Sequence, residues 1–382
     1  MYHDLTQGNI TRGLLRFALP MIAGDLLQQF YNIADTLIVG RALGRDALAA
    51  VGSAFSLMIF LTSVFLGLSM GAGALFSIRR GQGDDRGLRT AAGHAFLLIA
   101  GVTAVLTAAV YLLLDGILRF LQIPPALYAP MREYLAIIFA GLAGTFLYNF
   151  FACLLRAVGN SVAPLWFLGA AALLNVGLDL LFVLVFRWGV AGAAAATVIA
   201  QTLSGAGLAA YTWRRCRELL PLPGEFRLEG AVFRELWGLS SLTCLQQCAM
   251  NFGILLIQRL VDSFGPVTMA AFAAGVKIDA FAYLPVQDFG NAFSTFVAQN
   301  YGAGQSERLR RGFRRAMALS LGFACLLSAA AAGFAEPLMG LFLQPEETAV
   351  LAAGVRYLRI EGAFYPGIAC LFLLYGIYRA VR

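Results

Sequence analysis

Polar residues follow one face of the first long apolar segment of the chain, between residues 14 and 40. They recur at intervals of three, four and three residues: Asp25, Gln28, Asn32 and Asp35. A helix places all four on one side. Charged and amide groups are costly in hydrocarbon, so this side must face a wet interior or another helix. Hydrogen bonds between helices would explain the amides, but two carboxylates exceed that need and indicate a site for a positively charged ligand.

A second polar pair lies in the segment near residues 162–186, which is otherwise apolar. Asn175 and Asp179 are four residues apart and share a helix face, as do Tyr31 and Asp35 in the first segment. Two helices that each offer a carboxylate and a neutral oxygen can form a small oxygen cage. Such a cage suits a hard cation, and a buried carboxylate suits a proton. The spacing alone does not determine whether the two helices touch.

The segment near residues 267–299 carries further polar groups. Asp288 and Asn291 follow Pro285, whose ring disturbs a helix and frees a carbonyl group. We expect this stretch to line a cavity. Lys277 and Asp279 are two residues apart and do not face each other on a helix, so both are expected near the outer membrane interface.

Pro20 lies inside the first segment, where its ring removes the hydrogen bond to the carbonyl of Arg16. The consequence is either a permanent kink or a hinge. The hinge hypothesis couples bending at Pro20 to the charge at Asp35.

Enzyme chemistry has little support in the sequence. His3 and His94 are the two histidines, and no Ser-His-Asp set, His-Glu-x-x-His run or metal-spaced cysteine pair occurs. We therefore expect no catalytic residue and no cofactor other than a coupling ion.

The composition places these residues in a membrane protein. The 382 residues are 60% hydrophobic and 13% charged, whereas soluble domains average about 25% charged. Residues 95–114 and 316–335 are each uncharged and long enough to cross a bilayer as a helix. An all-α polytopic bundle is predicted, with ten spans near residues 14–40, 46–78, 91–121, 132–158, 162–186, 190–213, 233–262, 267–299, 315–343 and 352–378.

The chain also repeats itself. A shift of 221 places residues 44–124 on residues 265–345, so that Gly81 and Gly83 align with Gly302 and Gly304. Six spans precede the second copy, so the two copies run parallel. We predict an N-terminal lobe at 1–213, a cytoplasmic linker at 214–232 and a C-terminal lobe at 233–382 with four spans.

The arginines predict the orientation. Nineteen of the 27 lie on the side of the N-terminus, which predicts a cytoplasmic N-terminus in a cell (plasma or inner) membrane. Anionic lipid headgroups are the expected neighbours of this charge, and no nucleic acid is needed to explain it.

Three regions of the chain resemble the multidrug and toxic compound extrusion (MATE) transporters. Residues 17–20, 27–32 and 35–40 together resemble that family's first helix, residues 298–304 the end of its eighth, and residues 156–160 the end of its fourth. The resemblance implies two lobes of six helices each around a V-shaped cleft, and antiport of organic cations against sodium or protons. It also implies a monomer.

The resemblance further implies a cation site in the first lobe, formed by Tyr31, Asp35, Asn175, Asp179 and Thr197, with sodium at Asp35, Asn175 and Asp179. The glutamate that some members carry on the seventh helix is replaced by Gln246 and Gln247. The family's last two helices have no counterpart, so we expect a truncated sequence or an impaired protein.

Two other functions remain open at this stage. A flippase for lipid-linked oligosaccharides has a similar architecture, although such proteins need more basic cavity residues than are found here. A non-functional fragment is the other alternative. A dye-efflux assay separates both from a pump.

Overall fold

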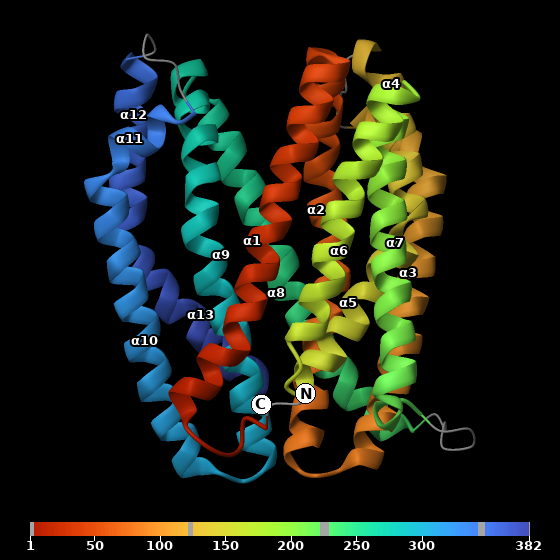
Figure 1. The fold of residues 1–382 in the computed structure, drawn as a ribbon, viewed down its shortest axis with the longest axis vertical. Coiled ribbons are helices and arrows are strands. Elements are labelled where there is room, and N and C mark those ends of the chain that lie inside the picture. Colours follow the sequence, from red (N-terminus) through yellow and green to blue (C-terminus); the bar gives the residue numbers. More distant parts are fainter. Residues whose placement is uncertain (1–3, 121–124, 222–228, 343–347, 382) are drawn as a thin grey trace. The chain divides into compact units, whose positions relative to one another are not determined.

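The computed structural model describes residues 4–120, 125–221, 229–342 and 348–381, and every regular element among them is a helix (Figure 1). The all-α prediction is thus confirmed. The elements are α1 (Ile10–Leu43), α2 (Arg45–Gly81), α3 (Asp85–Phe120), α4 (Pro125–Ala140), α5 (Leu142–Ala157), α6 (Val162–Asp179), the π-helix η1 (Leu180–Val185), α7 (Gly189–Arg215), the 3₁₀ turn η2 (Arg217–Leu219), α8 (Gly230–Asp262), α9 (Pro266–Gly302), α10 (Ser306–Gly333), α11 (Ala335–Gly340), α12 (Thr348–Ala363) and α13 (Tyr365–Ala380).

Seven helices in the described ranges are long and apolar enough to cross a membrane, or up to nine if each of two bent pairs counts as one span. The pairs are α4 with α5, bent by 44°, and α12 with α13, bent by 46°. α1 is not among these nine, although it has 34 residues, because its polar stripe lowers its hydropathy. Over the described residues the ten predicted segments fall on these helices and pairs, except that 315–343 continues from α10 into α11; residues 121 and 343, at the ends of two segments, lie outside the described ranges.

The break between α12 and α13 has a local cause. Pro366 has no N–H to donate to the carbonyl of Gly362, four residues earlier. Ser328 of α10 donates its hydroxyl to that free carbonyl. The carbonyl that Pro366 frees is therefore satisfied, and the bond ties α10 to the bend.

The chain divides into two compact units, each of which is described by itself. The first unit is Leu27–Cys248, and the second comprises residues 4–26 and 249–381 of the described chain. α1 therefore begins in the second unit and continues into the first, whereas α8 begins in the first and continues into the second. The boundaries of the predicted lobes were taken from the internal sequence repeat and not from contacts between helices. These boundaries therefore stay a prediction.

Close helix contacts hold the first unit together. A Cβ on Gly144 of α5 would lie 2.7 Å from the Cα of Thr202 on α7, and one on Gly205 would lie 2.5 Å from the Gly144 carbonyl oxygen. Glycine lets the two backbones approach in hydrocarbon, where packing drives helix association. Nearby, the rings of Phe76 and Phe150 meet edge to face at 6.3 Å. This packing fixes α7, which in turn contacts α6 along its length (Figure 1).

The second unit is built around α9, which contacts α10, α12 and α13 (Figure 1). Its N-terminal segment is held by what we call the N-terminal clasp: Gln299, Asn300 and Arg308 around Leu5–Gly8. The Arg308 guanidinium donates to the carbonyl oxygens of Leu5, Gln7 and Gly8, at 2.7 Å for Gln7 and 2.9 Å for Gly8. Asn300 donates to the Leu5 carbonyl at 3.2 Å, and Leu5 is 2% exposed. The clasp ties the start of α1 to the end of α9 and the start of α10.

Candidate cation site

The first unit brings together the five side chains of the predicted cation site. Tyr31 and Asp35 lie on the second half of α1, Asn175 and Asp179 on α6, and Thr197 on α7. The carboxyl groups of Asp35 and Asp179 lie within hydrogen-bonding reach of each other. Asp179 is 0% exposed, Asn175 2% and Thr197 8%. The contact between the two helices, which the spacing left open, is therefore present.

Asn175 orients the pair. With its amide placed to satisfy both neighbours, the NH₂ group donates to Asp179 Oδ2 at 3.1 Å and the oxygen accepts from the Thr197 hydroxyl at 3.3 Å. Asp179 Oδ1 and Asp35 Oδ1 are both buried and have no hydrogen-bond partner among the described residues. Buried carboxylate oxygens without partners are costly. This geometry fits a proton or a small cation shared by the two carboxyl groups.

Neutral oxygens complete the surroundings of the two carboxyl groups. The Tyr31 hydroxyl lies within hydrogen-bonding reach of Gln28 and of Gln201 on α7. The Gln201 side-chain oxygen also accepts from Thr145 of α5 at 2.6 Å. Hydroxyl and amide oxygens beside carboxylates are ligands that a hard cation prefers. The donor set thus fits sodium as well as a proton.

Sequence reasoning missed two of these neighbours. Gln201 follows Thr197 by four residues in an apolar segment, so its helical spacing was a usable signal. Tyr134 of α4, which is 4% exposed, lies near enough to Asp35, Asp179 and Tyr31 for an electrostatic interaction across the buried site. An aromatic residue in a membrane helix is too common to be a signal by itself.

The backbone changes form directly after Asp179. α6 ends at that residue and continues as the π-helix η1, and short π-helical turns occur frequently at functional sites. Val183 of η1 packs with Val39 of α1 and Ala193 of α7. This small cluster holds the end of α1 beside the two carboxyl groups.

A small cavity lies beside the site, with a volume of about 100 Å³. Gln28, Tyr31, Asn175, Thr197 and Gln201 are among its lining residues. Pockets for drug-sized ligands measure roughly 300–1,000 Å³. The cavity therefore has room for a few water molecules or a hydrated ion, and not for an organic drug.

The residues predicted to line a substrate cavity belong to different units. Gln28 and Asn32 lie in the first unit, whereas Asp25, Asp288 and Asn291 lie in the second. Asp288 is 3% exposed. The Asn291 side-chain oxygen accepts from Arg379 at 3.1 Å. A cavity shared by all five stays a prediction, and so does the hinge at Pro20, which lies inside α1.

Lys277 and Asp279 differ in their surroundings, and their place near the outer membrane interface stays a prediction. Lys277 is exposed, whereas Asp279 is partly buried, lies within hydrogen-bonding reach of the Tyr365 hydroxyl and interacts with Glu361 of α12. α9 turns Asp279 toward α12 and α13. The second unit thus holds an acidic pair of its own.

Comparison with known proteins places the whole chain in one family. The model of the MatE family matches residues 20–181 and 243–382. A multidrug resistance MATE family transporter of the MOP superfamily, solved in an outward-facing conformation, superimposes with a TM-score of 0.90 at 21% identity, covering 98% of this chain and 84% of that one. A MATE structure in a bent conformation gives a TM-score of 0.89 at 22% identity.

Three curated transporters are similar to this chain along most of its length. The probable multidrug resistance protein YpnP of Bacillus subtilis is 30% identical over 378 residues, which are 99% of this chain and 84% of the relative. The probable multidrug resistance protein NorM of Thermotoga maritima is 25% identical over 340 residues, 87% of this chain and 72% of that protein. A relative from Shewanella oneidensis, an FAD transporter, is 26% identical over 359 residues, 89% of this chain and 76% of that protein.

The family model covers most of the chain, and the first relative aligns along nearly all of it. Members of this family are transporters and not enzymes. The chain therefore belongs to the MatE family of multidrug and toxic compound extrusion transporters, and it is a multi-pass membrane protein.

Proposed function

We propose that the protein exports amphipathic organic cations by antiport against sodium or protons. One observation carries the proposal: Asp35 and Asp179 face each other in the first unit, and each keeps a buried oxygen without a partner. Two such groups hold a small positive ion strongly and repel each other without one. Whether an ion is bound therefore changes the free energy of the arrangement of α1 and α6 that forms the site.

Alternating access follows from differential binding. A coupling ion stabilises the arrangement in which α1 and α6 bring the two carboxylates together, and its loss favours another arrangement. An organic cation that binds better to the second arrangement is then moved in the opposite direction. Sodium and proton serve this scheme equally well.

Each residue has a role in this scheme. Asn175 positions Asp179, while Tyr31 and Thr197 supply neutral oxygens to the ion. Pro20 lets α1 bend, and Asp25, Gln28, Asn32, Asp288 and Asn291 face the organic substrate. The protein acts as a monomer in the cell membrane with its N-terminus in the cytoplasm, and it needs no cofactor other than the coupling ion.

The test is efflux of a fluorescent lipophilic cation from proteoliposomes, under a sodium gradient alone and then under a proton gradient alone. The Asp35→Asn and Asp179→Asn variants should insert normally and lose uphill efflux. Asp85→Asn is the matched control, because Asp85 is exposed and pairs with Arg80 at the surface. Wild-type efflux by Asp35→Asn refutes the proposal.

The FAD-transporting relative suggests a sharper version of this test. FAD is an anion, whereas the candidate site is acidic, which favours cationic substrates for this chain. Transport of FAD at the rate of the dye, insensitive to Asp35→Asn, would replace the organic-cation proposal with an anion exporter.

A further inference from the structure

Four exposed arginines lie together at the start of α10: Arg310, Arg311, Arg314 and Arg315, which we call the α10 arginine patch. At 100° per residue they cover one side of the helix. The opposite side is packed, because Ala316 is buried and a Cβ on Gly312 would collide with the Phe296 ring. The patch therefore points away from the core of the second unit.

The protein provides little counter-charge for the patch. Arg311 pairs with Glu307 at 3.0 Å, with the two side chains 67% and 66% exposed. An ion pair so open to water is weak. Arg310, Arg314 and Arg315 make no ion pair or hydrogen bond with any residue that the structure describes. Three guanidinium groups thus remain available to a ligand.

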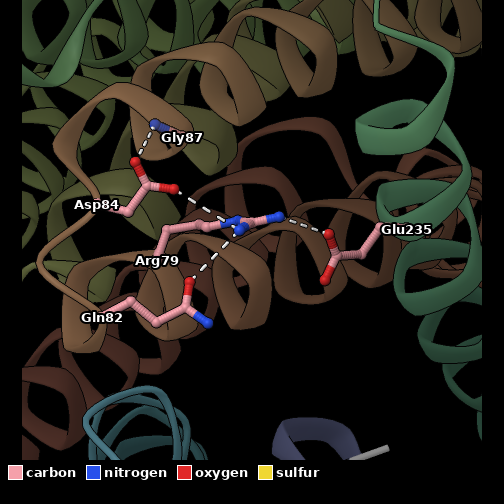
Figure 2. A network of polar contacts seen from close by, with 5 residues as sticks. All are labelled: Arg79, Gln82, Asp84, Gly87 and Glu235. Atoms are coloured by element: carbon pink, nitrogen blue, oxygen red, sulfur yellow. Dashed lines mark hydrogen bonds and ion pairs between the residues drawn. The ribbon is translucent and has the colours of Figure 1, made fainter.

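The equivalent stretch of the first copy pairs two of its four arginines with acidic side chains. Arg79 pairs with Glu235 at 2.7 Å and with Asp84 at 3.6 Å, and Asp84 accepts from the Gly87 N–H at 2.8 Å (Figure 2). Arg80 pairs with Asp85 at 3.2 Å. Arg79 and Arg80 are therefore neutralised within the fold.

The second copy has lost these acids and gained arginines. The shift of 221 places Gln305 and Ser306 at the positions of Asp84 and Asp85. It also places Arg311, Arg314 and Arg315 at the positions of Thr90, Gly93 and His94. Residues 79–94 hold four arginines and two aspartates, whereas residues 300–315 hold five arginines and one glutamate. The excess charge belongs to one copy and is not a general property of the loop.

The patch lies where a membrane surface would meet it. The uncharged stretch of α10 begins at residue 316, directly after Arg315. At about 1.5 Å per residue, the patch lies within roughly 10 Å of the hydrocarbon edge. Tyr301 at the end of α9 is 45% exposed, as is typical of aromatic residues at membrane interfaces. A hollow of about 550 Å³ adjoins the patch, and Arg308, Arg311 and Glu307 are among its lining residues.

We propose that the α10 arginine patch binds the phosphate headgroups of anionic phospholipids in the adjoining leaflet. Guanidinium groups bind phosphate oxygens in pairs of parallel hydrogen bonds, and clustered arginines beside a spanning helix attract anionic lipid. Lipid is favoured over an acidic protein because the charges adjoin a membrane span. The proposal does not depend on the transport mechanism.

The experiment uses native mass spectrometry of the full chain in detergent with added phosphatidylglycerol or phosphatidylcholine. Wild type should retain phosphatidylglycerol and lose phosphatidylcholine. Arg310→Gln with Arg314→Gln should lower phosphatidylglycerol retention several-fold. The control is Arg356→Gln with Arg359→Gln, which removes the same charge from exposed arginines of α12 in the same unit.

Two further measurements keep the test decisive. Arg310→Lys with Arg314→Lys should restore part of the retention, because charge returns without the paired hydrogen bonds. Thermal unfolding of every variant in phosphatidylcholine should match wild type, which separates lipid binding from misfolding. Equal retention by wild type and the glutamine variant overturns the proposal, and so does displacement of the lipid by millimolar inorganic phosphate.

Discussion

Each unit holds a pair of acidic side chains, and the pairs differ in what surrounds them. In the first unit, Asp179 is fully buried, and it keeps one oxygen without a partner, as Asp35 does. Asp35 is partly exposed, as are Asp279 and Glu361 in the second unit, and Asp279 also keeps one buried oxygen without a partner among the described residues. The second pair differs in that neither member is fully buried and in that the Tyr365 hydroxyl lies within hydrogen-bonding reach of Asp279.

The difference indicates where ion dependence should reside. A carboxylate that accepts a hydrogen bond near water is already partly stabilised, whereas a fully buried one depends on a proton or ion. The first pair should therefore respond to the coupling ion, and the second should act mainly in packing α9 against α12 and α13.

The largest expected effect is the loss of coupled efflux in Asp35→Asn. Removing one charge from a buried pair that binds an ion should cost roughly 3 kcal/mol, or about a hundredfold in coupled transport rate. Dye efflux under an imposed gradient measures it. Asp279→Asn should keep at least half of the wild-type rate; an equal loss in both variants would remove the distinction between the pairs.

Next in size is the effect of Asn175→Ala on ion affinity. The Asp179 carboxylate would lose its amide donor, which should weaken ion binding roughly tenfold. The concentration of coupling ion that gives half-maximal efflux reports this change. Asn160→Ala is the matched control, because Asn160 is also buried and accepts from the Ala163 N–H at 3.1 Å outside the site. A similar change in both variants would count against a positioning role for Asn175.

Thermal stability should change in opposite directions in the two units. Without coupling ion, Asp35→Asn should raise the apparent Tm, because the substitution relieves repulsion between buried carboxylates. Asp279→Asn should lower stability by at most about 1 kcal/mol, because the Tyr365 hydroxyl lies within hydrogen-bonding reach of Asp279 and would meet a weaker, neutral acceptor. Differential scanning fluorimetry in detergent measures both. If both substitutions shifted the Tm in the same direction, the two acidic pairs would not be distinguished by their partners.

The last comparison concerns stabilising contacts at the starts of α1 and α8, which should not change coupled efflux. Arg308→Gln should release the N-terminal clasp and speed hydrogen exchange at residues 5–8, at a cost of about 2 kcal/mol. Arg79→Gln should cost less than about 1 kcal/mol, because its pair with Glu235 is partly exposed. A larger loss of stability for Arg79→Gln would reverse this ranking.

Much of the fold was predictable because its causes are local. Long uncharged runs must be helical in hydrocarbon, and the three-and-four spacing of Asp25, Gln28, Asn32 and Asp35 needs only the helical period. The bends were not predicted, although Pro366 within the last segment was an available signal. The break at Gly141 offered less, because a single glycine in a membrane helix is common.

The candidate site required more than local information. Asp35 and Asp179 are 144 positions apart in the numbering, and no rule of spacing says that α1 and α6 meet. The contributions of Gln201 and Tyr134 depend on how α7 and α4 pack, and the burial of Asp279 depends on how α9 faces α12.

The sequence by itself determined which segments are helices, which of their faces are polar and which copy of the repeat carries extra arginines. Hydrophobicity and helical period act over a few residues, so they can be read directly from the chain. Tertiary packing alone decided which carboxylates meet and which oxygens stay buried without partners. It also decided that α1 and α8 each divide between the two units. Those outcomes depend on contacts between distant helices, where a glycine or a proline sets the approach of two backbones.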